Sequence, residues 1–141
     1  MEQQDKFKDN PNGVITDSET GLFWLPKDAY GDLGKWVNWN EAKQYMLTMS
    51  HVYAGGFPDW RLPTREEALS LFVPDATCID HAGEVVHIAR VFVPKCGQYI
   101  WTSEENEEGQ ALRIDLREGT EEFVDKETRE FQSTRGVRKQ N

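Results

Sequence analysis

The chain has 141 residues, with 25 Asp and Glu against 16 Lys and Arg, and it carries a net charge of −9 at neutral pH. This length fits one domain rather than two. Because the negative charge repels phosphate groups and no apolar run approaches the roughly 20 residues that cross a bilayer, we expect neither nucleic-acid nor membrane partners.

The first part of the chain predicts a β-hairpin followed by a loop. Residues 14–16 and 22–24 are short β-prone runs, and the stretch between them consists of turn-forming residues. Residues 25–37 contain a proline and two glycines, which is typical of a loop.

Two capping boxes predict two helices. An Asn-x-x-Glu pattern at residues 38–41 starts a helix that we expect to continue to about Ser50. A Thr-x-x-Glu pattern at residues 64–67 starts a shorter helix that runs through Phe72 and is ended by Pro74.

The second half of the chain predicts mainly strands. We expect residues 75–98 to be irregular apart from one candidate strand at residues 85–92. A strand at residues 100–103 comes next, and residues 112–117 then alternate between apolar and charged side chains, as half-buried strands do. Two further strands would complete an antiparallel sheet, at residues 122–125 and 133–138. Helices followed by antiparallel strands indicate an α+β fold.

Five stretches of the chain carry a resemblance to a known family: GVITDSETGLFW, VNWNEAKQY, DWRLPTREEALSL, YIWTS and TRGVRK. In this order they cover about residues 7–139 and resemble the Lcl C-terminal domain family, also called DUF1566. The segments VNWNEA and WRLPTREE are also similar to the formylglycine-generating-enzyme group. The resemblance implies one C-type-lectin-like domain over residues 1–141, with two short helices and an antiparallel sheet. It also implies a fold that is usually used for binding rather than catalysis.

Single residues of these motifs have expected structural roles. Arg61 lies between Trp60 and Leu62. Because a half-buried arginine is normally held by an ion pair or by carbonyls, we expect it to pair with a carboxylate such as Asp59 or Glu67. Four tryptophans stand at motif positions of the family, where we expect them to pack in the core: Trp24, Trp39, Trp60 and Trp101.

Differences from the family's sequence pattern indicate in which cellular compartment the protein is located. Family members often carry cysteines where this chain has Met46 and Gly136, so the disulfide that the family implies cannot form here. The chain also starts without the apolar segment of a signal peptide. Both features favour a cytoplasmic location. The secreted adhesins of the family favour the opposite, and the sequence leaves this alternative open.

Motifs of common enzyme classes are missing from the sequence, which contains no HExxH, GxSxG, Walker A, GxGxxG or EF-hand pattern. The enzymes of the formylglycine-generating group use a pair of C-terminal cysteines that bind copper, and no cysteine follows Cys96. We therefore predict that the protein is not an enzyme and has no cofactor.

An aromatic pair in the loop at residues 25–37 is the first candidate binding site. Tyr30 and Trp36 lie in this glycine-containing loop. An indole in such a loop either folds back as a lid on the core or faces a partner, because exposed tryptophans are rare but enriched at binding hot spots. The sequence supports both alternatives.

An acidic loop is the second candidate binding site. Glu104, Glu105 and Asn106 begin a stretch of closely spaced oxygen ligands that ends at Gly109. Such ligands could hold Ca²⁺, but glutamates before a glycine are also typical of a solvated hairpin loop. In either case the loop can form part of a surface that faces a partner.

Both cysteines and two of the three histidines fall in one short stretch. Cys78, His81, His87 and Cys96 form the pattern C-x2-H-x5-H-x8-C. The stretch is compatible with two free thiols, with a disulfide, or with a tetrahedral Zn²⁺ site whose second half matches no standard finger. We predict no metal ligands.

The sequence as a whole predicts a non-enzymatic binding module that acts inside the cell through protein–protein contacts. The acidic charge favours a protein partner with a basic surface. The alternative is an extracellular domain that binds a ligand or a glycan, as in the adhesin relatives. Neither the identity of the partner nor the oligomeric state can be read from the sequence.

Overall fold

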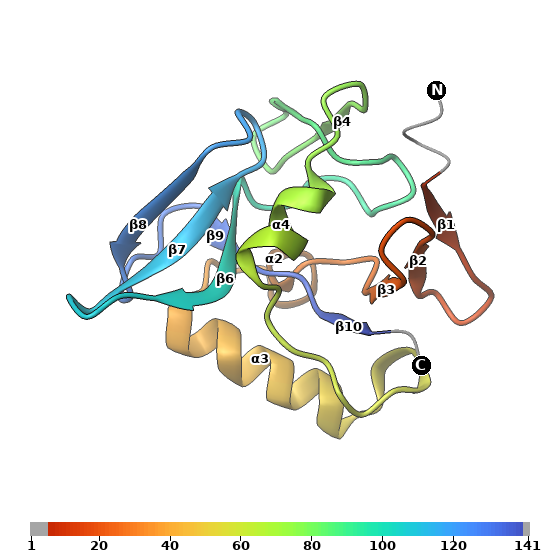
Figure 1. The fold of residues 1–141 in the computed structure, drawn as a ribbon, viewed down its shortest axis with the longest axis horizontal. Coiled ribbons are helices and arrows are strands. Elements are labelled where there is room, and N and C mark those ends of the chain that lie inside the picture. The colour runs from red at the N-terminus through yellow and green to blue at the C-terminus, as the bar shows by residue number, and fades with distance from the viewer. Residues whose placement is uncertain (1–5, 140–141) are drawn as a thin grey trace.

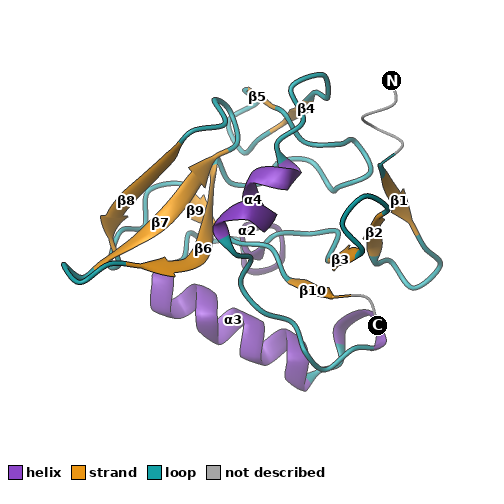
Figure 2. Cartoon of the chain, in the orientation of Figure 1, coloured by secondary structure: helices purple, strands orange, loops and turns teal. Residues whose placement is uncertain are grey.

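The structure is a computed structural model that describes residues 6–139. The first five residues of the chain and the expected domain limits at residues 1 and 141 lie outside this range. The helices and strands of the described residues are α2 (Ala29–Leu33), α3 (Trp39–His51), the 3₁₀ turn η1 (Ala54–Gly56), α4 (Arg65–Leu71), β1 (Phe7–Asp9), β2 (Ile15–Asp17), β3 (Leu22–Trp24), β4 (Cys78–Ile79), β5 (Val85–Val86), β6 (Tyr99–Glu105), β7 (Gln110–Asp115), β8 (Glu121–Asp125), β9 (Gln132–Ser133) and β10 (Val137–Lys139). They form the α+β architecture that the sequence predicts, with a sheet at each side of the molecule and α3 below (Figures 1 and 2).

The first sheet contains the predicted hairpin. Strands β2 and β3 pair antiparallel with Ile15 opposite Trp24, which confirms the prediction for residues 14–16 and 22–24. Strand β1 extends the sheet on one side, and β10 pairs with the free side of β3, so that Val137 also lies opposite Trp24. The first and last strands of the described chain therefore belong to one sheet.

The second sheet has the order β8-β7-β6-β9, and its last pair is parallel. The prediction that residues 133–138 form one strand of this sheet is wrong, because the chain crosses from β9 in one sheet to β10 in the other. Arg135 lies in the crossing segment and is buried. Its guanidinium donates hydrogen bonds to the carbonyls of Leu25 and Pro26, and these bonds replace a continued strand ladder.

Strand β7 is buried on both faces, although its alternating sequence predicts a half-buried strand. Leu112 and Ile114 face one cluster of apolar side chains, and Ala111 faces another on the opposite side of the sheet. Arg113 shares that second face and is almost fully buried. Its guanidinium lies 3.7 Å from the ring centroid of Tyr99 and binds Glu122 at 2.8 Å, which allows a charged residue to occupy a covered position.

The two capping boxes exist as predicted. Asn38 and Glu41 start α3, which ends at His51, and Thr64 and Glu67 start α4, which ends at Leu71. The prediction of only two helices is wrong, however, because a third short helix, α2, lies within the expected loop at residues 25–37.

Helix α2 owes its existence to its two ends. The side chain of Asp28 accepts the N–H of Gly31 at 2.8 Å and so caps the first turn. Gly34 ends the helix with φ 70°, a left-handed conformation that glycine adopts without the clash a Cβ atom brings. The Asp28 cap and the left-handed Gly34 therefore set the two ends of this five-residue helix.

The expected strand at residues 85–92 is wrong beyond Val86. Strand β5 has only two residues and pairs with β4. After it, Ile88, Ala89 and Phe92 are buried as irregular chain between the two sheets. The apolar pattern of these residues reflects burial in the core cluster rather than pairing in a strand ladder.

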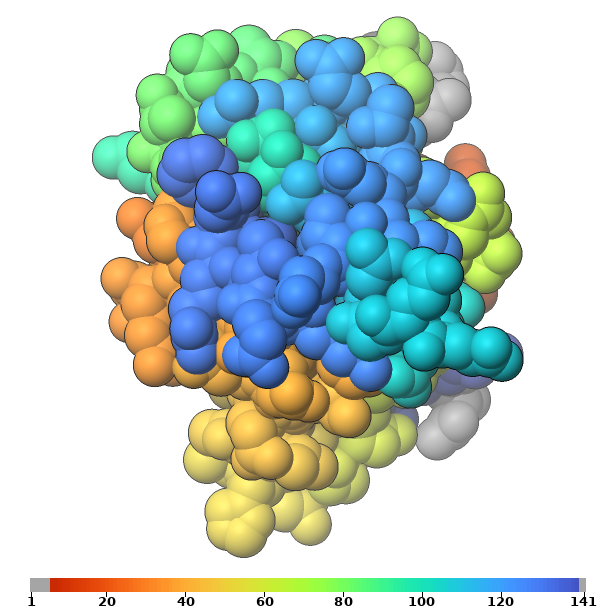
Figure 3. Space-filling model, turned by 90° about the vertical axis from the view of Figure 1, so that its left-hand side faces the viewer, coloured from red at the N-terminus to blue at the C-terminus, as the bar shows by residue number. Residues whose placement is uncertain are grey.

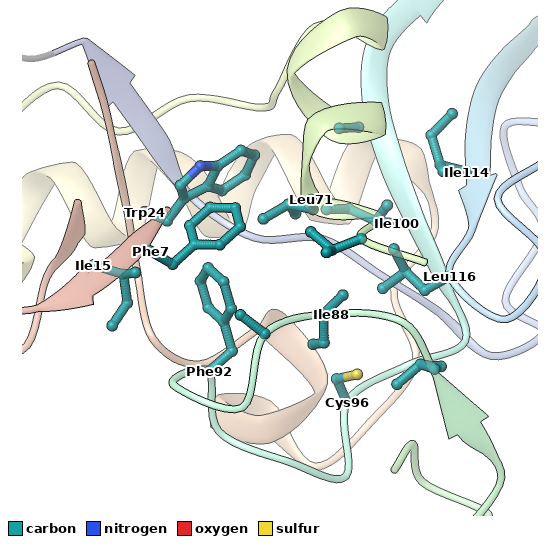
Figure 4. Close-up of a cluster of buried hydrophobic side chains, with 14 of the residues drawn as sticks. Phe7, Ile15, Trp24, Leu71, Ile88, Phe92, Cys96, Ile100, Ile114 and Leu116 are labelled. Atoms are coloured by element: carbon teal, nitrogen blue, oxygen red, sulfur yellow. The ribbon is translucent and has the colours of Figure 1, made fainter. Parts of the chain in front are cut away.

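Two apolar clusters make up the core. The first lies between the two sheets, where Leu71 of α4 stands between Trp24 and Ile100 (Figure 4). The second lies between the sheets and α3. The prediction for the motif tryptophans is confirmed, because none is more than 5% exposed: Trp24, Trp39, Trp60 and Trp101. None of the helices within residues 6–139 has the length and apolar character needed to cross a membrane.

Arg61 forms the expected ion pair, with Glu67 as its partner. The guanidinium binds both carboxylate oxygens, at 2.7 and 2.9 Å. Asp59, the other expected partner, binds Arg138 instead. Burial raises the pKa of Glu67, but the hydrogen bonds from Arg61 and from the Thr64 backbone outweigh it, so the pKa lies below its usual value of 4.5.

We expect replacement of Glu67 by glutamine to lower the free energy of unfolding by about 1–2 kcal/mol at neutral pH. Because the folded-state pKa is depressed, the charged form stabilises the fold above the ordinary pKa, and this stabilisation is lost as the pH falls through the folded-state value. The difference between wild type and Glu67→Gln should therefore shrink as the pH falls below the ordinary pKa of 4.5, as measured by urea unfolding across pH. Glu66→Gln, which changes an exposed neighbour on α4, is the control. An equal difference at every pH would contradict the prediction.

Candidate binding surface

Four aromatic rings from three separate segments of the chain meet at the surface. Tyr30 lies in α2, Trp36 follows it, His81 follows β4, and Phe131 precedes β9. The rings of Tyr30 and Trp36 are stacked with centroids 4.0 Å apart, and those of His81 and Phe131 are stacked at 4.7 Å. Trp36 meets His81 edge-on at 4.7 Å and Phe131 at 5.5 Å, so the four rings form one unit. We call these four residues the aromatic cluster.

The cluster is partly open to solvent. Phe131 is 43% exposed, and the other three side chains are half-buried. Phe131 also has φ 68°, a left-handed conformation that a bulky residue rarely adopts. The surrounding fold therefore holds this ring in place against its local preference.

Hydrogen bonds between distant segments hold the base of the cluster. The N–H of Tyr30 donates to the hydroxyl of Ser133 at 2.9 Å, which ties α2 to β9. The second carboxylate oxygen of Asp28 accepts the N–H of Gly97 at 2.7 Å. One buried carboxylate thus caps α2 and fixes the chain that enters β6.

Trp36 covers the main chain at Gly97. A Cβ atom on Gly97 would lie 2.8 Å from the Ser133 Cβ and 3.3 Å from the Trp36 Cζ3, so glycine allows the indole to approach closely. This packing agrees with the lid interpretation of Trp36. The half-buried ring still has an exposed part, which is available to a partner.

The acidic candidates lie elsewhere, in the hairpin between β6 and β7. Glu104 and Glu105 end β6, and Asn106 begins the turn. The Asn106 side-chain oxygen accepts the N–H groups of Glu108 and Gln110, which fixes the turn. Figure 3 shows this hairpin and the chain around α2 at opposite margins of one face, with the chain around β8 between them. The structure therefore brings Tyr30 and Trp36 together but separates them from the hairpin residues.

Glu105 is engaged in an ion pair. Its carboxylate binds the ammonium of Lys126 at 2.6 Å, and this hydrogen bond lowers the pKa of Glu105. Within residues 6–139, no three side chains of Asp, Glu, His or Cys are grouped closely enough to hold a metal ion. The hairpin has the features of the solvated loop, one of the two alternatives for these residues.

A groove of about 550 Å³ borders Glu105 and runs between α3, the chain before α4, and β6. Its apolar wall includes Met46 and Leu62. The ring of Trp39 lies there with the ammonium groups of two lysines 4.4 and 4.6 Å from its centroid. This groove cannot be predicted from the sequence, because its walls come from distant segments of the chain.

The cysteine–histidine stretch does not gather its side chains into a metal site, because within residues 6–139 no three of them are grouped closely enough to hold an ion. His81 belongs to the aromatic cluster, and His87 Nδ1 lies 2.9 Å from the carbonyl oxygen of Ala76. Both cysteines are free thiols in the structure. Burial raises the pKa of the Cys96 thiol to about 12, so that it stays protonated at neutral pH.

The sequence predicts half of the aromatic cluster. Tyr30 and Trp36 are candidates because they share one loop. The sequence pattern relates His81 to a metal site only, and it assigns no role to Phe131. Neither residue carries a local signal, since only the folded chain brings β4, β9 and α2 together.

The fold and the surface together define an α+β protein with a cluster of stacked aromatic rings at its surface. The family model of the Lcl C-terminal domain matches residues 13–138, and the chain belongs to this family. No curated protein and no solved structure matches the chain significantly.

Proposed function

We propose that the protein is a non-enzymatic binding module that acts through protein–protein contacts, with the aromatic cluster as its contact surface. The observation that carries the proposal is the stacking of Tyr30, Trp36, His81 and Phe131 at a partly open surface. Aromatic residues dominate the binding energy of many protein interfaces. Rings that already hold one another in place lose little conformational freedom when a partner binds.

The charge chemistry supports binding rather than catalysis. The shifted pKa values of the acidic groups belong to ion pairs with arginine or lysine. Glu41 is an example, since its hydrogen bond from Arg129 lowers its pKa to about 2. Tyr45 has a raised pKa because it is buried and hydrogen-bonded to Asp32. These groups are held in structural contacts, whereas a catalytic acid or base needs a pKa near the working pH.

The proposal includes a C-type-lectin-like fold, which the resemblance implies. It is supported by the pairing of β10 with β3, which joins the two ends of the described chain in one sheet. The long, mostly irregular segment between α4 and β6 supports it as well, since C-type lectins carry long loops in this part of the fold. A cytoplasmic location belongs to the proposal too, and the two free thiols support it.

The proposal predicts that loss of one exposed ring abolishes partner capture. Phe131→Asn removes the most exposed ring of the cluster, and asparagine tolerates the left-handed conformation at this position. We expect affinity capture from native lysate to recover at least tenfold less of a specific partner with this variant than with wild type, which corresponds to about 1.4 kcal/mol of binding energy. The melting temperature should stay close to that of the wild type.

A matched control separates the cluster from general surface effects. Leu47→Ala removes an apolar side chain that is 63% exposed on α3, away from the cluster, and should leave capture unchanged. Trp36→Ala should also abolish capture, with a modest drop in melting temperature because Trp36 covers Gly97. Equal capture by wild type and by both cluster variants would refute the proposal.

A further inference from the structure

Strand β8 is the outer strand of the second sheet and has an unpaired edge. The sheet order places it beside β7 only, and Figure 1 shows it as the outermost strand of its sheet. At one end of the β7–β8 pairing, the N–H of Asp115 donates to the carbonyl of Thr120. At the other end, the N–H of Lys126 donates to the carbonyl of Gly109. Between these bonds the antiparallel alternation directs the main chain of Glu122 and Val124 towards β7.

The same alternation turns the next set of main-chain groups outward. The N–H and C=O groups of Glu121 and Phe123 point away from β7, towards solvent. Both side chains are exposed, and Phe123 is 41% exposed. Within residues 6–139, no strand pairs with this edge of β8. The edge therefore offers hydrogen-bond donors and acceptors that another extended chain can use.

The negative charge of the chain segment that contains β8 favours a basic partner segment at this edge. Residues 104–130 contain eleven Asp and Glu but only four Lys and Arg, so this stretch carries −7 of the net charge of −9. Some of these acids are neutralised within the chain, as Glu122 is by Arg113. Within the described residues, Glu118, Asp125 and Glu130 form no ion pair with a lysine or arginine.

We propose that the outer edge of β8 is a docking site for a basic, extended segment of a partner protein, which adds to the second sheet as a further strand. Main-chain hydrogen bonds to Glu121 and Phe123 would supply the pairing, and basic side chains would lie beside the unpaired carboxylates. A second copy of this chain fits poorly, because β8 against β8 would set acidic residues opposite one another. The proposal goes beyond the aromatic cluster, since it names a different surface and the chemistry of its occupant.

The test uses the full chain and a synthetic peptide of about ten residues that alternates lysine with valine. We expect saturable binding by fluorescence anisotropy that weakens as salt is raised, because exposed charges are screened. An otherwise identical peptide that alternates glutamate with valine should not bind. A lysine–valine peptide that is N-methylated at every residue keeps its charge but has no main-chain N–H group to donate from either edge, and it should bind at least tenfold more weakly.

A pair of variants at Phe123 separates the main-chain edge from the side chain. Phe123→Pro removes an N–H that points outward and leaves the ladder to β7 complete, so it should weaken peptide binding at least tenfold. Phe123→Thr also removes the ring but keeps the N–H, and it should bind within about threefold of wild type. Since the N-methylated peptide tests the edge on the unaltered protein, the result does not depend on the folding of Phe123→Pro.

Three outcomes would overturn the proposal. Equal binding of the N-methylated and unmodified peptides would mean that the peptide adheres through charge alone. Unchanged binding to folded Phe123→Pro would exclude this edge. Self-association of the wild type that Phe123→Pro abolishes would make a second copy the occupant. Phe131→Asn should leave peptide binding intact, so that failure at this edge is distinguishable from failure of the aromatic cluster.

Discussion

Replacement of Trp60 by alanine is expected to lower the free energy of unfolding by about 3–5 kcal/mol. The side chain is only 4% exposed and lies in the cluster between α3 and the sheets. Its indole N–H donates to the carbonyl of Ala54 at 2.8 Å. The substitution removes buried apolar surface and a hydrogen bond and leaves a cavity that the surrounding core fills only in part. Urea unfolding followed by circular dichroism would measure the loss.

Two comparisons give this prediction its controls. Trp60→Phe keeps most of the ring and should recover at least half of the lost stability. Tyr53→Ala removes an aromatic ring from the same part of the chain, but that ring is 60% exposed, so the loss should stay below about 1 kcal/mol. An unchanged unfolding midpoint in Trp60→Ala would contradict the placement of this residue in the core.

Gly55→Ala should be the second most damaging change, with a loss of about 2–4 kcal/mol. Gly55 has φ 62°, and a Cβ atom there would lie 2.4 Å from the Cγ2 of Val14. Val14 is fully buried, and its branched side chain has little freedom to move aside. The alanine therefore adds a steric clash to the strain of a left-handed conformation. Thermal and urea unfolding of the variant would measure the sum.

The two contributions can be measured separately. Gly34 has a similar φ of 70° with open space around it, so Gly34→Ala reports the conformational strain alone, about 1 kcal/mol. In a Val14→Ala background the additional cost of Gly55→Ala should fall towards that value. Equal costs for Gly55→Ala and Gly34→Ala would show that Val14 does not resist the added methyl group.

Features with a local cause could be predicted from the sequence. The hairpin depends on a turn between two β-prone runs, and both capping boxes depend on residues three positions apart. Helix α2 also had local signals, in Asp28 and Gly34. These signals do not predict a helix on their own, because a glycine lies between them, and a glycine in so short a stretch favours a loop.

Features that depend on contacts across the chain could not be predicted. The split of residues 133–138 between two sheets requires the partner of β10, which is β3 at the other end of the chain. The burial of Arg113 requires a second apolar cluster on the far side of the sheet. For the candidate site, Tyr30 and Trp36 were predicted because they are close in sequence, whereas His81 and Phe131 join them only through tertiary structure.

The pairing of β10 with β3 also has a consequence for how the protein folds. Val137 and Trp24 meet across more than a hundred residues of chain, so this contact can form only after a very large loop has closed. Folding rates fall as the average separation of contacting residues rises, and we therefore expect slow folding on the scale of milliseconds to seconds. On the ribosome, one edge of β3 would stay unpaired until β10 has been synthesised, which exposes the nascent chain to aggregation until then.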